Sequence, residues 1–325
     1  MKLLRRISVV LTVAGLVAFS VGGCSPTTSG AVKDDTTLTG TSKELAKTSS
    51  DVAEYQGPKL RVGVVNFLNK TPSKVLGIGE AASDILGTIL QKTGRFIVIP
   101  QQDMESILAQ QRMGATGAIN PDTAAKMGEI LGLNAILTGA VTAYSEAEEG
   151  SDYLVYKSKK QIARVTVDYR IVDTTTGVQL MADSGAGIYE KSTGGALGMG
   201  SKAGYDSDLR DGALRDALTK AMVNMTKSLG KRKWNGRIAQ VDGNNLYINA
   251  GQKSGLNVGD KLDVYRPGKD IIDPVTKVKL GTTENLVGKA LVLKNDIGDQ
   301  ADLSIANSTS GSGFKPGDIV KLSGK

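Results

Sequence analysis

The side chains that carry most enzyme chemistry are nearly missing from this 325-residue sequence, which has no histidine and one cysteine. Without histidine there is no imidazole base, Ser-His-Asp triad or histidine-ligated metal, and a lone cysteine excludes an intrachain disulfide, a zinc ribbon and a redox pair. General acid–base catalysis would have to use carboxylates or lysines with shifted pKa values. The sequence shows no pair of such residues placed to act together. We therefore expect no enzymatic activity, no metal and no other cofactor.

The one side chain placed for a specific reaction is the thiol of Cys24. A short basic stretch (1–6) precedes an apolar stretch (7–21) that ends in small residues, which predicts an export signal over residues 1–23. The four residues Val-Gly-Gly-Cys that end at Cys24 resemble a bacterial lipobox. This resemblance implies cleavage before Cys24 and lipid, including palmitate, on its thiol, and several acyl chains give stable anchoring. The alternative is ordinary signal cleavage that leaves Cys24 as a free thiol.

The segment after Cys24 indicates where the anchor would lie. Ser25 follows, and in the Gram-negative sorting rule for lipoproteins the absence of Asp at that position indicates the outer membrane. Residues 24–58 are rich in Ser, Thr and Gly and contain few large apolar groups. Such a segment buries too little to order itself, so we expect a lipidated flexible tether on the periplasmic side of the membrane.

The elements that would position a site follow over residues 59–232. Strict alternation over residues 162–171 predicts a strand with one buried and one solvated face. Apolar residues at helical spacing predict helices that begin near residues 78, 121 and 207, each followed by a glycine that ends it. Strands and helices together indicate an α+β domain, a mixed sheet with packed helices.

Four segments of this domain carry a family resemblance: residues 64–71, which contain Val-Val-Asn-Phe and Asn-Lys-Thr, and residues 90–99, 107–111 and 128–140. With the order of strands and helices, they resemble the CsgG family of outer-membrane lipoproteins, the curli secretion channels and their relatives, over residues 60–230. The resemblance implies a periplasmic α+β domain, ring-shaped homo-oligomers and a barrel to which each subunit lends hairpins.

The loop after the first strand departs from this family. In the secretion channel that loop carries aromatic residues that form a constriction, whereas residues 68–76 contain none. A pore constriction in this chain would therefore use Phe67, Asn69 or their neighbours.

Two segments are the candidate membrane hairpins, residues 150–161 and 183–202. Membrane-spanning strands need about 9–11 residues with an apolar outer face. The first segment contains three lysines and the second is rich in glycine, so the alternative, that both are solvent loops, stays open. If they span, the candidates for lipid-facing positions are Tyr153, Val155, Ile188 and Leu197.

Residues 233–325 show short strands separated by turns and no helical period, which predicts a small all-β barrel-like domain. Two segments, 255–264 and 313–322, share a Gly-Asp turn that leads into an alternating strand. This part weakly resembles the C-terminal β domain of the flagellar assembly protein FlgT.

Two functions from different classes follow from these features. The first is an outer-membrane lipoprotein forming a ring-shaped oligomeric channel for export of protein subunits such as curli-type fibres. The second is a periplasm-facing lipoprotein adaptor that scaffolds a cell-envelope structure without a transmembrane pore. Expected partners are further copies of the chain, the outer membrane through the lipid anchor, and a secreted or envelope protein. The net charge of +7 is too small to predict nucleic-acid binding.

Overall fold

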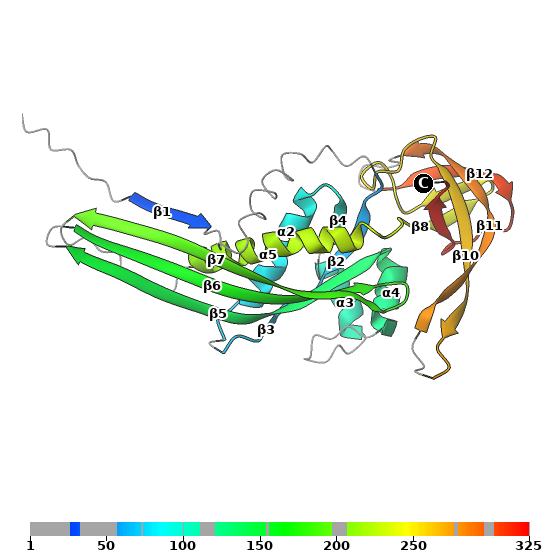
Figure 1. Cartoon of the computed structure of the whole chain (residues 1–325). Coiled ribbons are helices and arrows are strands. Elements are labelled where there is room, and N and C mark those ends of the chain that lie inside the picture. Colours follow the sequence, from blue (N-terminus) through cyan, green and yellow to red (C-terminus); the bar gives the residue numbers. More distant parts are fainter. Residues whose placement is uncertain are drawn as a thin grey trace, which may run out of the picture.

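The computed structural model describes residues 27–32, 57–72, 74–99, 101–110, 121–153, 156–196, 207–275, 279–295 and 302–324. They form a long mixed sheet with helices on both faces, followed by a closed barrel (Figure 1). The α+β fold class predicted from the sequence is confirmed.

The first part of the chain is built on a seven-stranded sheet. Its strand order is β1-β7-β6-β5-β2-β4, and β3 pairs with β5 off this path. Strands β5, β6 and β7 form an antiparallel meander, whereas β2 runs parallel to both β4 and β5. The strands are β1 (Thr27–Val32), β2 (Leu60–Val64), β3 (Leu68–Asn69), β4 (Phe96–Ile99), β5 (Ala135–Tyr153), β6 (Tyr156–Asp173) and β7 (Gln179–Ala196).

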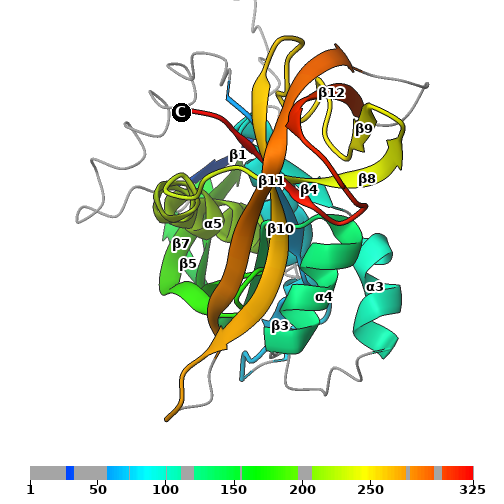
Figure 2. The same cartoon turned by 90° about the vertical axis from the view of Figure 1, so that its right-hand side faces the viewer.

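Four described helices cover the two faces of this sheet: α2 (Ile78–Lys92), α3 (Gln101–Gln110), α4 (Pro121–Leu131) and α5 (Ser207–Leu229). Helix α2 begins after Gly77 and is followed by Gly94, and both glycines have positive φ, which residues with a Cβ adopt at a cost. Helices α2 and α5 pack on one face, and α3 and α4 on the other, where Met104 and Met127 are fully buried. Figure 2 shows α5 on one side of the sheet and α3 and α4 on the other.

Strand β6 carries the alternation that the sequence predicts. Val165, Val167 and Tyr169 are buried toward α5, whereas Arg164 and Arg170 are exposed on the opposite face. The core on the α5 side continues into the barrel through Trp234. One apolar core therefore joins the two parts of the chain.

The second part is a closed six-stranded barrel of order β10-β11-β12-β9-β8-β13. Strands β10 and β11 continue past the barrel as a two-stranded arm, visible in Figure 2. The sequence predicted only the barrel portions of these two strands, because the arm has little apolar alternation. The strands are β8 (Gly236–Asp242), β9 (Asn245–Ile248), β10 (Lys261–Ile272), β11 (Lys279–Asn295), β12 (Ser304–Gly311) and β13 (Ile319–Leu322).

The barrel contains two turns of the same conformation, as the repeated Gly-Asp motif predicts. Asp260 accepts a hydrogen bond from the Asn257 N–H at 2.8 Å, and Asp318 accepts one from the Lys315 N–H at 2.9 Å. In each copy two glycines have positive φ, 75° and 91° in the first and 74° and 91° in the second. Both turns lead directly into barrel strands, β10 and β13.

Strand β1 differs from the sequence-based expectation, which had residues 24–58 as a flexible tether. Residues 27–32 instead pair with residues 189–194 of β7 in antiparallel register. The apolar content of these residues gave no sign of a strand. An edge strand is stabilised by backbone hydrogen bonds to its neighbour, and these need no apolar side chains.

Candidate functional site: the long strands and the loop at their base

Phe67, a candidate constriction residue, is a core residue within the single chain. Its side chain is 4% exposed, and its N–H donates a hydrogen bond to the Ser83 hydroxyl at 2.8 Å. A Cβ at Gly139 would lie 2.6 Å from the Phe67 ring, so the glycine makes room for the aromatic side chain. The sequence showed the aromatic residue but not the glycine that receives it.

Asn69, the other candidate, is exposed and organises the loop between β3 and α2. Its side-chain amide donates to the Val75 carbonyl at 2.6 Å, and its Oδ1 accepts from the N–H and the hydroxyl of Thr71 at 3.1 and 2.7 Å. The same loop exposes Leu76 almost completely, at 89%. Asn69 therefore fixes an exposed loop at the base of the long strands.

We call the distal half of β5, β6 and β7 the ribbon, residues 144–153, 156–165 and 187–196. In Figure 1 it extends to the left beyond the start of α5. The cross-strand pairs assign residues to its two faces, because residues directly opposite each other share a face. The face toward α5 therefore carries the charged residues Glu146, Glu148 and Lys191, and the opposite face carries Glu149, Lys160, Arg164 and Glu190.

Several of these charges are paired along the ribbon. Lys160 lies 3.0 Å from Glu190 on the face away from α5, and Lys191 lies 3.5 Å from Asp208 at the start of α5. The side chains of Lys160, Glu190 and Lys191 are 35%, 16% and 20% exposed, so both pairs are partly shielded from water. The charged residues were visible in the sequence, but the strand register that pairs them was not.

The close packing of α5 on the backbone of β7 was not predicted from the sequence. A Cβ at Gly187 would lie 2.5 Å from the Ala217 nitrogen and 2.9 Å from the Ala217 Cβ, and a Cβ at Gly185 would lie 2.6 Å from the Ala217 carbonyl oxygen. The helix backbone therefore rests directly on the strand. The signal was present as Gly-x-Gly in one segment and alanines four residues apart, at 213, 217 and 221, in the other.

A buried ion pair on α5, between Asp216 and Lys220, binds β7 next to Gly187. The Asp216 carboxylate accepts hydrogen bonds from the Ile188 N–H at 2.9 Å and from the Lys220 ammonium at 2.8 Å. Both charged side chains are more than 90% buried. Further along, the Tyr169 hydroxyl lies 3.1 Å from Asp183, and burial raises the pKa of Tyr169.

The remaining predicted site residues lie at the end of the ribbon or outside the described residues. Tyr153 is the last residue of β5, where its backbone pairs with Tyr156, and Ile188 is half-buried in β7. Cys24, Val155 and Leu197 lie outside the described residues.

Two features are missing from the part of the chain that the structure describes. Among the described residues, no helix combines the length and the apolar character needed to cross a membrane. Within the same residues, no three His, Cys, Asp or Glu side chains cluster in a way that would hold a metal ion.

The chain belongs to the CsgG family, because the family model for the curli production assembly/transport component CsgG matches residues 44–256. This is a family of transport and assembly proteins, and the resemblance seen in the sequence is confirmed. No functionally curated protein matches the chain.

Solved structures resemble parts of the chain at low sequence identity. Lipoprotein GNA1162 from Neisseria meningitidis is 22% identical, with a TM-score of 0.31, and the match covers 52% of this chain and 98% of that one. The LpoB C-terminal domain from Escherichia coli is 14% identical, with a TM-score of 0.30, covering 45% and 93%. A PelC dodecamer from Paraburkholderia phytofirmans is 14% identical, with a TM-score of 0.24, covering 60% and 96%.

Proposed function

We propose that this protein is a lipid-anchored outer-membrane component that scaffolds the transport or assembly of an envelope structure from the periplasmic side. Its ribbon stands on the membrane and does not cross it. Copies of the chain assemble into a closed ring, because identical head-to-tail contacts between subunits anchored in one membrane plane favour closure.

The charges on both faces of the ribbon carry this proposal. A membrane-spanning strand needs one apolar face toward lipid, and a Lys or Arg on that face costs about 2–4 kcal/mol at the midplane. Glu148 and Lys191 occupy the face toward α5, and Glu149, Lys160 and Glu190 the other. Neither face therefore offers the continuous apolar band that lipid requires.

The register of β1 supports the same conclusion. Thr27 pairs with Gly194, which lies opposite Ser158, only a few residues from the tip of the ribbon. Cys24 is three residues before Thr27, a reach of at most about 10 Å. An acylated Cys24 would therefore hold the tip close to the lipid surface, whereas crossing requires an apolar band about 25 Å tall beyond it.

The length of the strands favours a second candidate, the oligomeric secretion channel. Strands β5, β6 and β7 contain 19, 18 and 18 residues, against the roughly 9–11 that a membrane strand needs. In that case β1 would separate from β7 and the ribbon would insert into the membrane. The candidates for lipid-facing positions would then be Tyr153, Val155, Ile188 and Leu197. The pore would be bordered by Asn69, with Phe67 close to it in the chain.

Electron microscopy and conductance separate the two candidates. Detergent-extracted protein should form rings without a transmembrane belt, and it should not conduct ions in planar bilayers. Rings with a belt and a steady conductance would establish the channel instead. Monomers under all extraction conditions would contradict both candidates.

The anchor and the β1 register have their own tests. Cys24→Ala should move the cleaved protein from the membrane to the soluble fraction; retention in the membrane would show that lipid is not the anchor. Ser29→Cys with Ser192→Cys joins a cross-strand pair of β1 and β7, so oxidation should crosslink it. Val32→Cys with Ser192→Cys, which is out of register, is the matched control and should stay reduced.

A further inference from the structure

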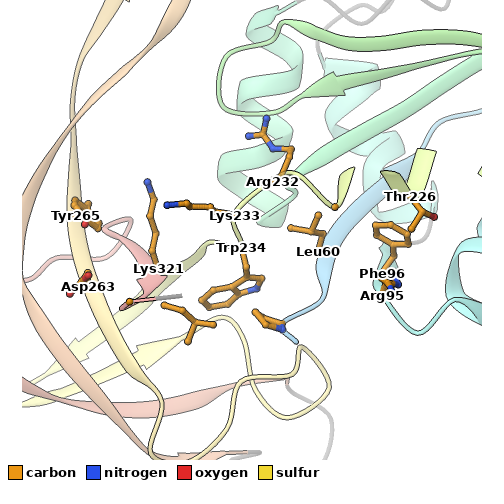
Figure 3. A pocket seen from close by; sticks show the side chains of 14 residues that line it. Leu60, Arg95, Phe96, Thr226, Arg232, Lys233, Trp234, Asp263, Tyr265 and Lys321 are labelled. Atoms are coloured by element: carbon orange, nitrogen blue, oxygen red, sulfur yellow. The ribbon is translucent and has the colours of Figure 1, made fainter. Parts of the chain in front are cut away.

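A pocket of about 360 Å³ opens where the sheet domain meets the barrel (Figure 3). The starts of β2 and β4 and the end of α5 line one side, and strands β10 and β13 line the other. The connection after α5, which contains Arg232, Lys233 and Trp234, runs between them. The volume of the pocket is at the small end of the range for ligand pockets in proteins.

The base of the pocket is apolar. Leu60, Phe96 and Trp234 line it, and each is no more than 7% exposed. The hydroxyl oxygen of Thr226, also in the lining, is buried and has no hydrogen-bond partner within the described structure. An apolar group of a ligand would rest on this base, whereas the Thr226 oxygen has almost no surface open to the pocket and would not bond to it.

Four cationic side chains surround this base: Arg95, Arg232, Lys233 and Lys321. They come from different segments: the turn between α2 and β4, the connection after α5, and β13. Basic residues near the end of a helix are favoured by the helix dipole, which accounts for Arg232 and Lys233 after α5 and agrees with Arg95 after α2. It does not account for Lys321 in β13, and the fold brings these separate segments to one place.

Two of these cations are held in position by neighbouring acids. Arg232 pairs with the buried carboxylate of Asp173, and Lys321 pairs with Glu284. The Lys321 ammonium also lies 5.1 Å from the centroid of the Tyr265 ring. Cations fixed in this way lose little conformational entropy when an anion binds.

The one carboxylate in the lining, Asp263, is paired with a cation outside it. Lys289 donates a hydrogen bond to Asp263 at 2.7 Å, and this bond lowers the pKa of Asp263. The acid is therefore paired, as Arg232 and Lys321 are, and the pocket lining itself contains four cations and this one carboxylate.

We propose that this pocket binds a short acidic peptide segment of a partner protein, with an apolar side chain against Trp234 and a carboxylate toward the cationic side chains. A peptide is favoured over a lipid headgroup because the pocket lies at the junction with the barrel, and the barrel is at the end of the molecule away from the ribbon (Figure 1). This choice rests on the proposed function, in which the tip faces the membrane.

Trp234 is the only tryptophan in the chain, so its fluorescence reports on this pocket alone. The full chain in detergent is titrated with the tetrapeptide acetyl-Leu-Asp-Leu-Asp-amide, and in parallel with the neutral version in which both Asp are Asn. The acidic peptide should change the Trp234 emission in a saturable way, and the neutral peptide should bind at least about tenfold more weakly. Equal responses to the two peptides, or no response, would overturn the proposal.

Matched variants test the charge requirement. Arg95 and Lys233 are exposed, so Arg95→Gln with Lys233→Gln should fold normally and weaken peptide binding about tenfold. Lys253→Gln with Lys294→Gln removes two exposed barrel cations outside the lining and should leave binding unchanged. Equal losses in both double variants would contradict a site in this pocket.

A third probe distinguishes the two sources of anionic groups. Vesicles of phosphatidylglycerol, compared with vesicles of phosphatidylcholine, should not change the Trp234 emission. If phosphatidylglycerol changes it and the acidic peptide does not, a lipid is the ligand and the peptide proposal is wrong. Because these titrations need neither a ring nor an intact anchor, their outcome is independent of the tests of the proposed function.

Discussion

The contact between α5 and β7 predicts a large effect from one added methyl group, Gly187→Ala. Its Cβ would lie 2.5 Å from the Ala217 nitrogen and 2.9 Å from the Ala217 Cβ, and closer still to the Ala213 carbonyl oxygen. Two of these atoms are backbone, so the clash cannot be relieved by a side-chain rotation. The helix must move by about 1 Å to restore normal contacts of 3.3 Å or more, which opens a packed interface.

Overpacking of this kind costs about 2–3 kcal/mol. We expect Gly187→Ala to lower the melting temperature, followed by far-ultraviolet circular dichroism, by roughly 5–10 °C. The matched control is Gly281→Ala in β11, where a Cβ would meet nothing within 4 Å and the change should be neutral or slightly stabilising. If the two variants have the same melting temperature, α5 does not rest on β7 as described, and the base of the ribbon is not rigid.

Three further changes test other contacts. Ser83→Ala leaves the buried Phe67 N–H without its acceptor and should cost about 1–2 kcal/mol in urea denaturation. Arg232→Ala removes the cation from the buried Asp173 carboxylate and should cost about 3 kcal/mol in the same assay. The pKa of Asp183 is lowered, mainly by the Ser184 N–H. The carboxylate therefore stabilises the fold above the usual Asp pKa of about 4, and this contribution is lost as the pH falls through the lowered pKa. Asp183→Asn should reduce this acid dependence of the melting temperature.

Much of the fold was readable because burial left its period in the sequence. The alternation over 162–171 gave β6 its buried and solvated faces, and the two Gly-Asp motifs gave two copies of one barrel turn. The distal halves of β5 and β7 had no such period, because the core covers only their first residues, such as Tyr144 and Tyr189 on the face toward α5. Backbone pairing and cross-strand ion pairs such as Lys160 with Glu190 hold them, and register cannot be read from one strand alone.

The candidate site was harder to predict because its features depend on contacts between distant segments. Phe67 was expected to border a pore, and the glycine at 139 that accommodates its ring lies more than 70 residues away. The cationic pocket joins Arg95 to Lys321 across the whole fold, so no local motif marks it. The basic run at residues 231–233 was visible in the sequence, but its favourable interaction with the dipole of the preceding helix was sufficient to explain it.

Helix α5 is the element that the ribbon and the pocket share. Its middle rests on Gly187 of β7, and its last turn contributes Thr226 to the pocket wall. The contacts of Gly185 and Gly187 with Ala217 leave no space for a methyl group, so this packing holds α5 directly against the base of the ribbon. We expect a peptide in the pocket to meet this wall without moving the ribbon. The arrangement suits a scaffold, which must present a partner at a constant distance from the membrane, better than a gate, which requires a second packed position of α5.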